Sequence, residues 1–258
     1  MIIDSHCHLT YEPMFSSLDE TIKRANNDGI KYLLTICTED KGFENILKII
    51  NKYNCVFGSY GIHPHETSKH KKIDSDYIIK KIKDKKKIIG IGESGLDFYY
   101  NHSERDTQIK SFEEHIDASL KINKPLIVHT RSAEDETYEI LKNATKKNDL
   151  KILIHCFTGT KEFAFKMLDI GAYISASGVV TFKKSRELAN TFKEIPLEKM
   201  LVETDAPYLA PEPLRGKPNE PSYLKNTVKF LSDIKNISFD NFSKATSENF
   251  FKLFGKLE

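Results

Sequence analysis

Short apolar runs alternate with longer amphipathic runs along the whole chain. Residues 88–92 are apolar almost without a break, which is typical of a strand buried on both faces of a parallel sheet. In residues 43–53 the apolar positions Phe43, Ile46 and Ile50 recur at helical spacing. We therefore expect strands at residues 2–4, 32–37, 56–62, 88–92, 125–129, 151–155, 172–175 and 200–204. We expect helices at residues 18–27, 43–53, 77–82, 105–121, 133–145, 162–168, 185–192, 223–234 and 239–254.

This alternation predicts a fold of the α/β class. Eight units of strand followed by helix, within about 250 residues, indicate a (β/α)₈ or TIM barrel. One further helix follows at the C-terminus. No linker, low-complexity segment or longer repeat divides the chain, so we expect residues 1–258 to form a single domain.

The composition narrows the class of protein without indicating an activity. A net charge of +2 over 258 residues is too small to indicate nucleic-acid binding by itself. No apolar run reaches the length of a membrane span, and residues 1–4 lack the features of a signal peptide, so we expect a cytoplasmic protein. The four cysteines are scattered and form no CxxC pair, which favours small buried side chains over a disulfide framework.

The first predicted strand leads directly into two histidines, His6 and His8. In an extended chain, residues two apart point to the same side, so both imidazoles can reach one metal ion while Cys7 points away. Neutral imidazole is the commonest metal ligand among side chains, but two histidines are too few for a closed site. Further ligands must therefore come from later in the chain.

Four other predicted strands also end in residues that can bind metal. Glu93 follows the fourth strand, His129 and His155 end the fifth and sixth, and Asp205 follows the eighth. A parallel barrel brings these strand ends to one face, where its active site lies. Six such ligands are too many for one tetrahedral ion and suit two divalent ions about 3.5–4 Å apart.

The order of the strands predicts how the ligands divide between the two ions. Glu93 is the natural bridging carboxylate, with His6, His8 and Asp205 on one ion and His129 and His155 on the other. Nitrogen and oxygen ligands without thiolate allow magnesium, manganese, iron or zinc. A lone histidine after a strand is usually structural, but the repetition of the pattern favours a metal centre.

These residues lie in motifs that resemble the TatD family of metal-dependent deoxyribonucleases, within the amidohydrolase-like metal barrels. The resemblance runs from Asp4 to about Phe254, nearly the whole chain. Seven motifs in this order, each at a strand end, are far more specific than any one alone. They are DSHCHL at residues 4–9, GIHPHE at 61–66, GESGLD at 92–97, VHTR at 128–131, HCFTG at 155–159, SGVVTFK at 177–183 and ETDAPYL at 203–209, the last followed by RGKPNEP at 215–221.

The resemblance implies hydrolysis of phosphodiester bonds in DNA, with two divalent metal ions as cofactors. Glu93, Asp205 and His63 would be the catalytic residues, Asp205 by orienting or deprotonating the attacking water. His63 would hydrogen-bond the scissile phosphate, and His65 either assists it or begins a helix. Glu203 could orient a ligand histidine.

Two arginines and a run of aromatic residues each allow two interpretations. Arg131 and Arg215 are candidate phosphate contacts, since guanidinium matches phosphate in a bidentate fork, but a surface or carboxylate-paired arginine is an equal alternative. Residues 98–100, Phe-Tyr-Tyr, could stack on a base, although packing under their loop is the favoured interpretation.

Two other functions remain open at this point. The same metals could serve an esterase or a deacylase, for example one acting on aminoacyl-tRNA, because fold does not fix substrate. A binding protein without catalysis could also keep the barrel, although a complete ligand set argues against it. We expect a monomer with DNA as its substrate and no membrane partner.

Overall fold

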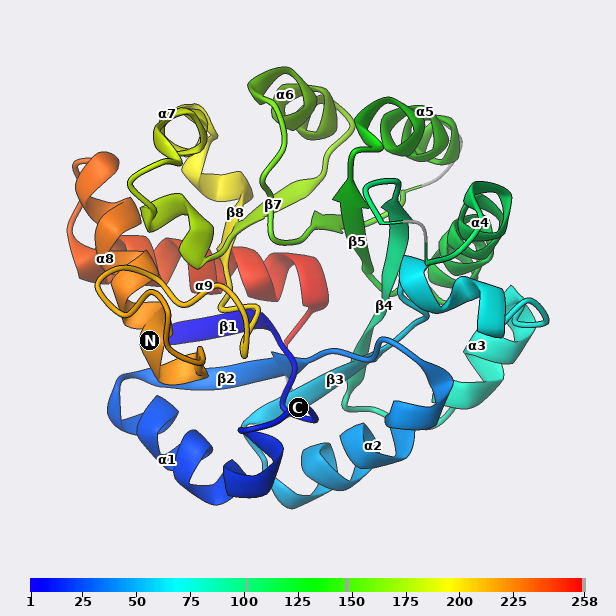
Figure 1. The fold of residues 1–258 in the computed structure, drawn as a ribbon, viewed down its shortest axis with the longest axis horizontal. Helices are drawn as coiled ribbons and strands as arrows, with labels where there is room; N and C mark the ends of the chain where they lie inside the picture. Colours follow the sequence, from blue (N-terminus) through cyan, green and yellow to red (C-terminus); the bar gives the residue numbers. More distant parts are fainter. Residues whose placement is uncertain (101, 147–148, 257–258) are drawn as a thin grey trace.

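Eight parallel strands form a barrel that is surrounded by helices, as the alternation predicted (Figure 1). The computed structural model describes residues 1–100, 102–146 and 149–256. The strands lie in the order in which they occur along the chain. They are β1 (Ile2–Cys7), β2 (Ile30–Thr35), β3 (Val56–Tyr60), β4 (Ile88–Asp97), β5 (Leu126–Arg131), β6 (Ile152–Ile154), β7 (Tyr173–Ala176) and β8 (Met200–Val202).

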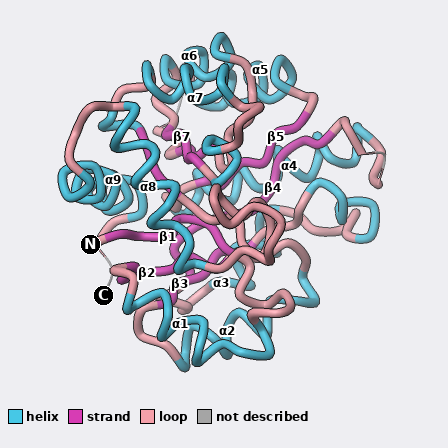
Figure 2. Tube along the Cα trace, turned by 60° about the vertical axis from the view of Figure 1, so that its left-hand side comes forward, coloured by secondary structure: helices cyan, strands magenta, loops and turns pink. Residues whose placement is uncertain are grey.

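The helices pack around the outside of the barrel, and the last one crosses an end of it (Figures 1 and 2). No helix within the described ranges is both long and apolar enough to cross a membrane. The helices are α1 (Leu18–Asn27), α2 (Phe43–Lys52), α3 (Ser75–Ile82), α4 (Arg105–Ile122), α5 (Glu134–Thr145), α6 (Lys161–Asp169), α7 (Arg186–Glu194), α8 (Leu224–Ile234) and α9 (Phe239–Phe254).

Side-chain alternation along each strand divides the core into two layers. On β5, Leu126 and Val128 pack in the layer under the surrounding helices, whereas Ile127 points into the barrel. The inner layer also contains Phe250 and Phe254 of α9. Most of its strand residues lie near the strand starts, so α9 and these residues fill the N-terminal end with apolar side chains. The C-terminal end is left for polar groups.

The barrel is joined between β8 and β1 by polar contacts near the strand ends. The buried carboxylate of Asp4 accepts hydrogen bonds from the backbone N–H and the hydroxyl of Thr204, at 3.0 and 2.6 Å. Beyond β8, the backbone N–H of Asp205 donates to the carbonyl of His6 at 2.9 Å, and that of His8 donates to Ala206 at 2.8 Å. The first motif and the last motif are thereby held side by side.

The largest difference from the predicted elements is at β4. This strand was expected to end at Gly92 but continues to Asp97, because two glycines let it pass close to β5. A Cβ at Gly95 would lie 2.0 Å from the carbonyl oxygen of His129, and the φ of Gly95 is +143°. Glu93 therefore lies inside a strand, at an irregular step in the pairing between Ile91 and Ser94, rather than in the loop that follows.

Other boundaries differ by a few residues. The first strand extends to Cys7 instead of residue 4, the second spans Ile30–Thr35 instead of 32–37, and the third ends at Tyr60 instead of residue 62. The eighth ends at Val202 instead of residue 204, because the chain turns there into the loop that carries Asp205. The four cysteines are all unpaired.

Candidate metal centre

A cavity of about 620 Å³ opens at the C-terminal ends of the strands. Most of the residues that the sequence proposed for the site line it, and His6 is fully buried below it. Arg215 is not among the lining residues. Those from the proposed set that line the cavity are His8, His63, His65, Glu93, His129, Arg131, His155 and Asp205.

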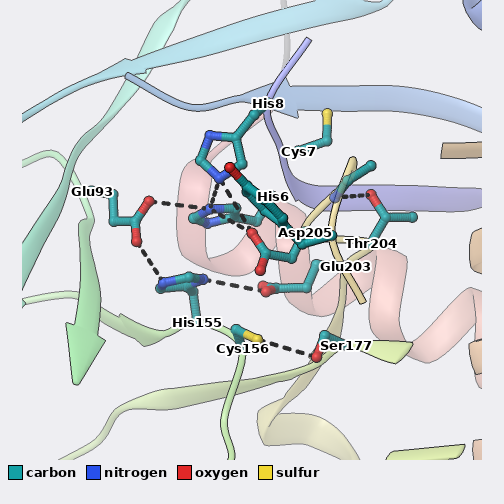
Figure 3. A network of polar contacts seen from close by, with 12 residues as sticks. His6, Cys7, His8, Glu93, His155, Cys156, Ser177, Glu203, Thr204 and Asp205 are labelled. Carbon is teal, nitrogen blue, oxygen red and sulfur yellow. Dashed lines mark hydrogen bonds and ion pairs between the residues drawn. The ribbon is translucent and has the colours of Figure 1, made fainter. Parts of the chain in front are cut away.

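A first cluster of donor atoms joins the end of β1 to the loop after β8 (Figure 3). His6 and His8 place their Nε2 atoms 3.3 Å apart, as their spacing predicted, and Cys7 points away. Asp205 Oδ1 lies 3.2 Å from His8 Nε2 and 3.7 Å from His6 Nε2. Glu93 Oε2 completes the cluster at 3.4 Å from His6 Nε2.

A second cluster gathers around the other oxygen of Glu93. Glu93 Oε1 lies 2.9 Å from His155 Nε2 and 3.2 Å from His129 Nδ1, and these two nitrogens are 3.3 Å apart. His63 Nε2 lies 3.5 Å from the same oxygen. The rings of His6 and His155 stack at 3.9 Å, which places the two clusters side by side. His63 thus lies in the second cluster beside the candidate ligands His129 and Glu93.

The spacing and the chemistry of these atoms fit metal ions. Nitrogen ligands of a tetrahedral zinc ion, each at about 2.0–2.1 Å, lie about 3.3–3.4 Å from one another. The donor pairs above have similar separations. Glu93 Oε2 is buried and has no hydrogen-bond partner among the described residues, a costly state that a cation relieves. The residues could therefore hold two cations, with Glu93 shared between them.

Two carboxylates stand behind the second cluster. Glu203 Oε1 lies 3.3 Å from His155 Nδ1, a contact through which Glu203 could orient this histidine (Figure 3). Asp97 Oδ2 lies 3.2 Å from His129 Nε2, a contact that the sequence reasoning missed. The missed signal was strand alternation: in a strand that continues past Gly92, Glu93 and Asp97 share a face.

The turn that carries Asp205 is held by a buried residue that was also missed, Asn219. Its Nδ2 donates to the carbonyl oxygens of Thr204 and Tyr208, at 2.8 and 2.6 Å. Asp205 itself has a φ of +54°, an unusual conformation for a residue other than glycine. These hydrogen bonds and the bond from Asp205 to His6 keep the carboxylate directed at the first cluster.

The charges of the site also favour the binding of a cation. Burial alone would raise the pKa of Glu93, but the imidazoles of His155, His63 and His129 hold it well below its usual value. Burial would likewise raise the pKa of Asp205, and His8 beside it lowers it. Both carboxylates are therefore ionised near neutrality and present negative charge to the space between the histidines, which suits a cation.

The proposed substrate residues differ in how they are placed. His63 begins the short helix η3 (Pro64–Lys69) and accepts the backbone N–H of His65 on Nδ1 at 3.1 Å, so the helix-entry role considered for His65 belongs to His63. His65 Nε2 lies 2.8 Å from Asp97 Oδ2. Arg131 faces the cavity, whereas the guanidinium of Arg215 lies over the Phe182 ring at 4.4 Å, outside it.

The aromatic residues after β4 also differ from expectation. Phe98 is partly buried against the core, as the packing interpretation predicted. Tyr99 and Tyr100, in contrast, are 59% and 41% exposed. Packing under the loop is therefore the wrong interpretation for the two tyrosines.

Comparison with known proteins identifies a family for this chain. Residues 3–255 match the model of the family described as TatD related DNase. An uncharacterized metal-dependent hydrolase, BU355 of Buchnera aphidicola, is 40% identical and is matched over 98% of each chain. The uncharacterized metal-dependent hydrolase YcfH of Escherichia coli is 34% identical over 98% of this chain and 95% of its own.

Solved structures show the same fold. The crystal structure of YjjV, a TatD homolog from Escherichia coli, superposes with a TM-score of 0.93 at 23% identity, over 99% of this chain and 98% of that one. A TatD family hydrolase from Entamoeba histolytica gives a TM-score of 0.88 at 24% identity, over 98% and 97% of the two chains. With the family match over nearly its whole length, the chain belongs to the TatD-related DNase family of metal-dependent hydrolases.

Proposed function

We propose that this hydrolase cleaves phosphodiester bonds in DNA with the help of two divalent metal ions. The observation that carries the proposal is the position of Glu93, whose two carboxylate oxygens face two separate clusters of donor atoms at the floor of one cavity. Two bound cations would supply an activated water and would offset the negative charge of a phosphodiester during attack.

Six residues would hold the ions. His6, His8 and Asp205 would bind one, His129 and His155 the other, and Glu93 would bridge them. The nitrogen and oxygen donors are compatible with Mg²⁺, Mn²⁺ or Zn²⁺. We expect a cytoplasmic monomer, in keeping with the unpaired cysteines.

Asp205 is the residue best placed to handle the proton of the attacking water. Its carboxylate is ionised because His8 lowers its pKa, and only its Oδ1 is engaged with the two histidines of the first cluster. The second oxygen can therefore accept a proton. The fixed turn around Asn219 holds it in one orientation.

His63 is suited to donate a hydrogen bond to the phosphate. Burial lowers the pKa of His63 to about 3, so its imidazole is neutral. Its Nδ1 accepts the backbone N–H of His65, which leaves the single ring proton on Nε2, the nitrogen nearer the centre of the site. A neutral donor at this place can orient a phosphate oxygen.

The test is a hydrolysis assay on metal-stripped protein to which Mg²⁺, Mn²⁺ or Zn²⁺ is returned. Labelled single-stranded and double-stranded DNA, RNA, simple esters and an aminoacyl-tRNA would be compared side by side. We expect cleavage of DNA that requires added metal and is lost in Asp205→Asn. Rapid hydrolysis of the ester or aminoacyl substrates without cleavage of DNA would overturn the proposal in favour of an esterase or deacylase.

A further inference from the structure

Exposed tyrosines stand beside the mouth of the cavity. Large hydrophobic side chains are otherwise seldom exposed in the part of the chain that the structure describes. Tyr99, in the loop after β4, is the most exposed of the tyrosines, at 59%. Tyr100 follows it and lines the cavity. The exposed large hydrophobic residues are Met1, Phe15, Tyr99, Tyr100 and Tyr208.

Arg131 is packed against these tyrosines. Its Cζ lies 4.0 Å from the centre of the Tyr99 ring and 4.8 Å from that of Tyr100. The contact follows from the sheet, because Asp97 pairs with Arg131 in the register of β4 and β5 and the N–H of Phe98 donates to the Arg131 carbonyl at 2.9 Å. Within the described residues the guanidinium has no ion pair and no hydrogen bond. Its N–H donors are held in place and free to bind an anion.

The position of the loop is fixed relative to the metal centre by Asp97, which is 1% exposed. Asp97 Oδ1 accepts the backbone N–H groups of Tyr99 and Tyr100, at 3.0 and 3.1 Å. Its Oδ2 contacts His129. The side chain of Gln108 also bonds both backbone groups of Asp97, at 2.8 and 3.1 Å. A ligand bound to the tyrosines would therefore lie at a fixed distance from the second cluster.

The combination indicates the class of ligand. An exposed aromatic ring stacks on a planar base of any sequence, and a free guanidinium binds phosphate. A base can stack on a protein ring only when one of its faces is uncovered, as in a single strand or an opened end. Resting on the proposed function, we propose that Tyr99, Tyr100 and Arg131 form a subsite for one unpaired nucleotide next to the cleaved bond. Tyr99 stacks on its base, and Arg131 binds its phosphate.

The test uses the metal-loaded enzyme and a single-stranded oligodeoxynucleotide of defined cleavage position. An abasic residue replaces, in turn, each nucleotide beside the cleaved bond. In the wild type, one of these replacements should raise KM about 10-fold, within the range of about 5–150-fold that corresponds to stacking one base. Tyr99→Ala should raise KM for the intact strand to the same extent and respond no further to that abasic residue. Tyr99→Phe should behave as wild type.

Two controls separate stacking from a general disturbance. Metal content should be unchanged in Tyr99→Ala, and Phe15→Ala, which removes an exposed aromatic residue elsewhere, should leave KM unchanged. Arg131→Gln should flatten the slope of log binding against log salt by about 0.7, as expected for one phosphate contact on a single strand.

The outcomes distinguish this subsite from the proposed function. If the wild type cleaves no DNA under any metal, the proposed function fails. If the wild type cleaves DNA but Tyr99→Ala keeps the full penalty of the abasic residue, the subsite is refuted while the nuclease remains. An unchanged salt slope in Arg131→Gln would remove Arg131 from it.

Discussion

The two clusters of the candidate metal centre share Glu93 but differ in the side chains that surround it. In the second cluster, the two proposed ligand histidines each contact a further carboxylate, Asp97 for His129 and Glu203 for His155. In the first cluster, the Nδ1 atoms of His6 and His8 are buried and have no hydrogen-bond partner among the described residues. The two clusters therefore differ in the hydrogen-bond partners of their histidines.

This difference bears on how tightly each half can hold a cation. A carboxylate behind an imidazole fixes which nitrogen carries the proton and makes the other nitrogen a stronger ligand. His155 shows the electrostatic consequence: burial alone would lower its pKa, but Glu93 and Glu203 raise it well above the usual value. We therefore expect the second cluster to be the tighter site.

The largest effect should come from the residue that both halves share. Glu93→Gln keeps the shape of the side chain but removes its charge and replaces one oxygen by a donor. We expect hydrolysis to fall by about 10³-fold, with bound metal, measured by mass spectrometry, below one ion per chain. Glu162→Gln, an exposed residue of α6 paired to Lys166 at 2.7 Å, is the matched control. Retention of two ions in Glu93→Gln would exclude Glu93 as the bridge.

Titration of the metal-stripped wild type with metal would test whether the two clusters differ in affinity. Among the described residues, only the second cluster has histidines hydrogen-bonded to carboxylates outside the proposed ligand set, Asp97 and Glu203. Such partners change metal affinity by about 10–100-fold, so the dissociation constants of the two binding steps should differ by about 100-fold. Calorimetry with Mn²⁺ or Zn²⁺ should resolve a tight step and a weak one. A single step with two equal sites would show that the carboxylates do not set affinity.

Removing the carboxylate of Asp97 should reduce the difference in metal affinity between the two clusters. Asp97 accepts hydrogens from two imidazoles and two backbone N–H groups, and an amide has only one acceptor oxygen, so Asp97→Asn cannot satisfy them all. We expect the tight step to weaken by about 10-fold and the weak step to stay the same. Nitrogen NMR should show the proton of His129 on Nε2 in the metal-stripped wild type. Equal weakening of both steps would point to general unfolding instead.

The smallest expected effect is on stability, and it comes from a histidine that belongs to neither cluster. His115 of α4 is buried and contacts no acidic side chain among the described residues. It accepts the Ile62 N–H on Nε2 at 3.0 Å, and burial lowers its pKa to about 4. Because the unfolded chain binds this proton more readily, stability is complete above about pH 6.5 and declines as the pH falls toward 4. At pH 5.5 the loss should be about 1 kcal/mol.

Urea unfolding of wild type and His115→Gln at pH 7.5 and 5.5 would measure this loss. The wild type should lose about 1 kcal/mol more than the variant between the two pH values, because glutamine does not titrate. Equal losses would mean that His115 is protonated in the folded state at pH 5.5 despite its burial.

Much of this arrangement follows from local pattern. The barrel, the end of it that carries the site and the pairing of His6 with His8 depend on periods of two and 3.6 residues and on the rule that parallel strands end together. Five strand ends with side chains that are able to bind metal could therefore be recognised before any coordinates. The same reasoning failed at residues 92–97, because three glycines in ten residues, Gly90, Gly92 and Gly95, are not typical of a strand.

The packing of β4 against β5 determines where β4 ends, which the local sequence pattern does not predict. Whether the chain continues as a strand beyond Gly92 depends on how closely the backbone of Gly95 approaches that of His129, which lies 34 residues further along the chain. The continuation places Asp97 behind His129 and brings Tyr99 onto Arg131. The candidate metal ligands could thus be named from local order, whereas the groups that contact them and line the mouth of the cavity required the long-range register of the sheet.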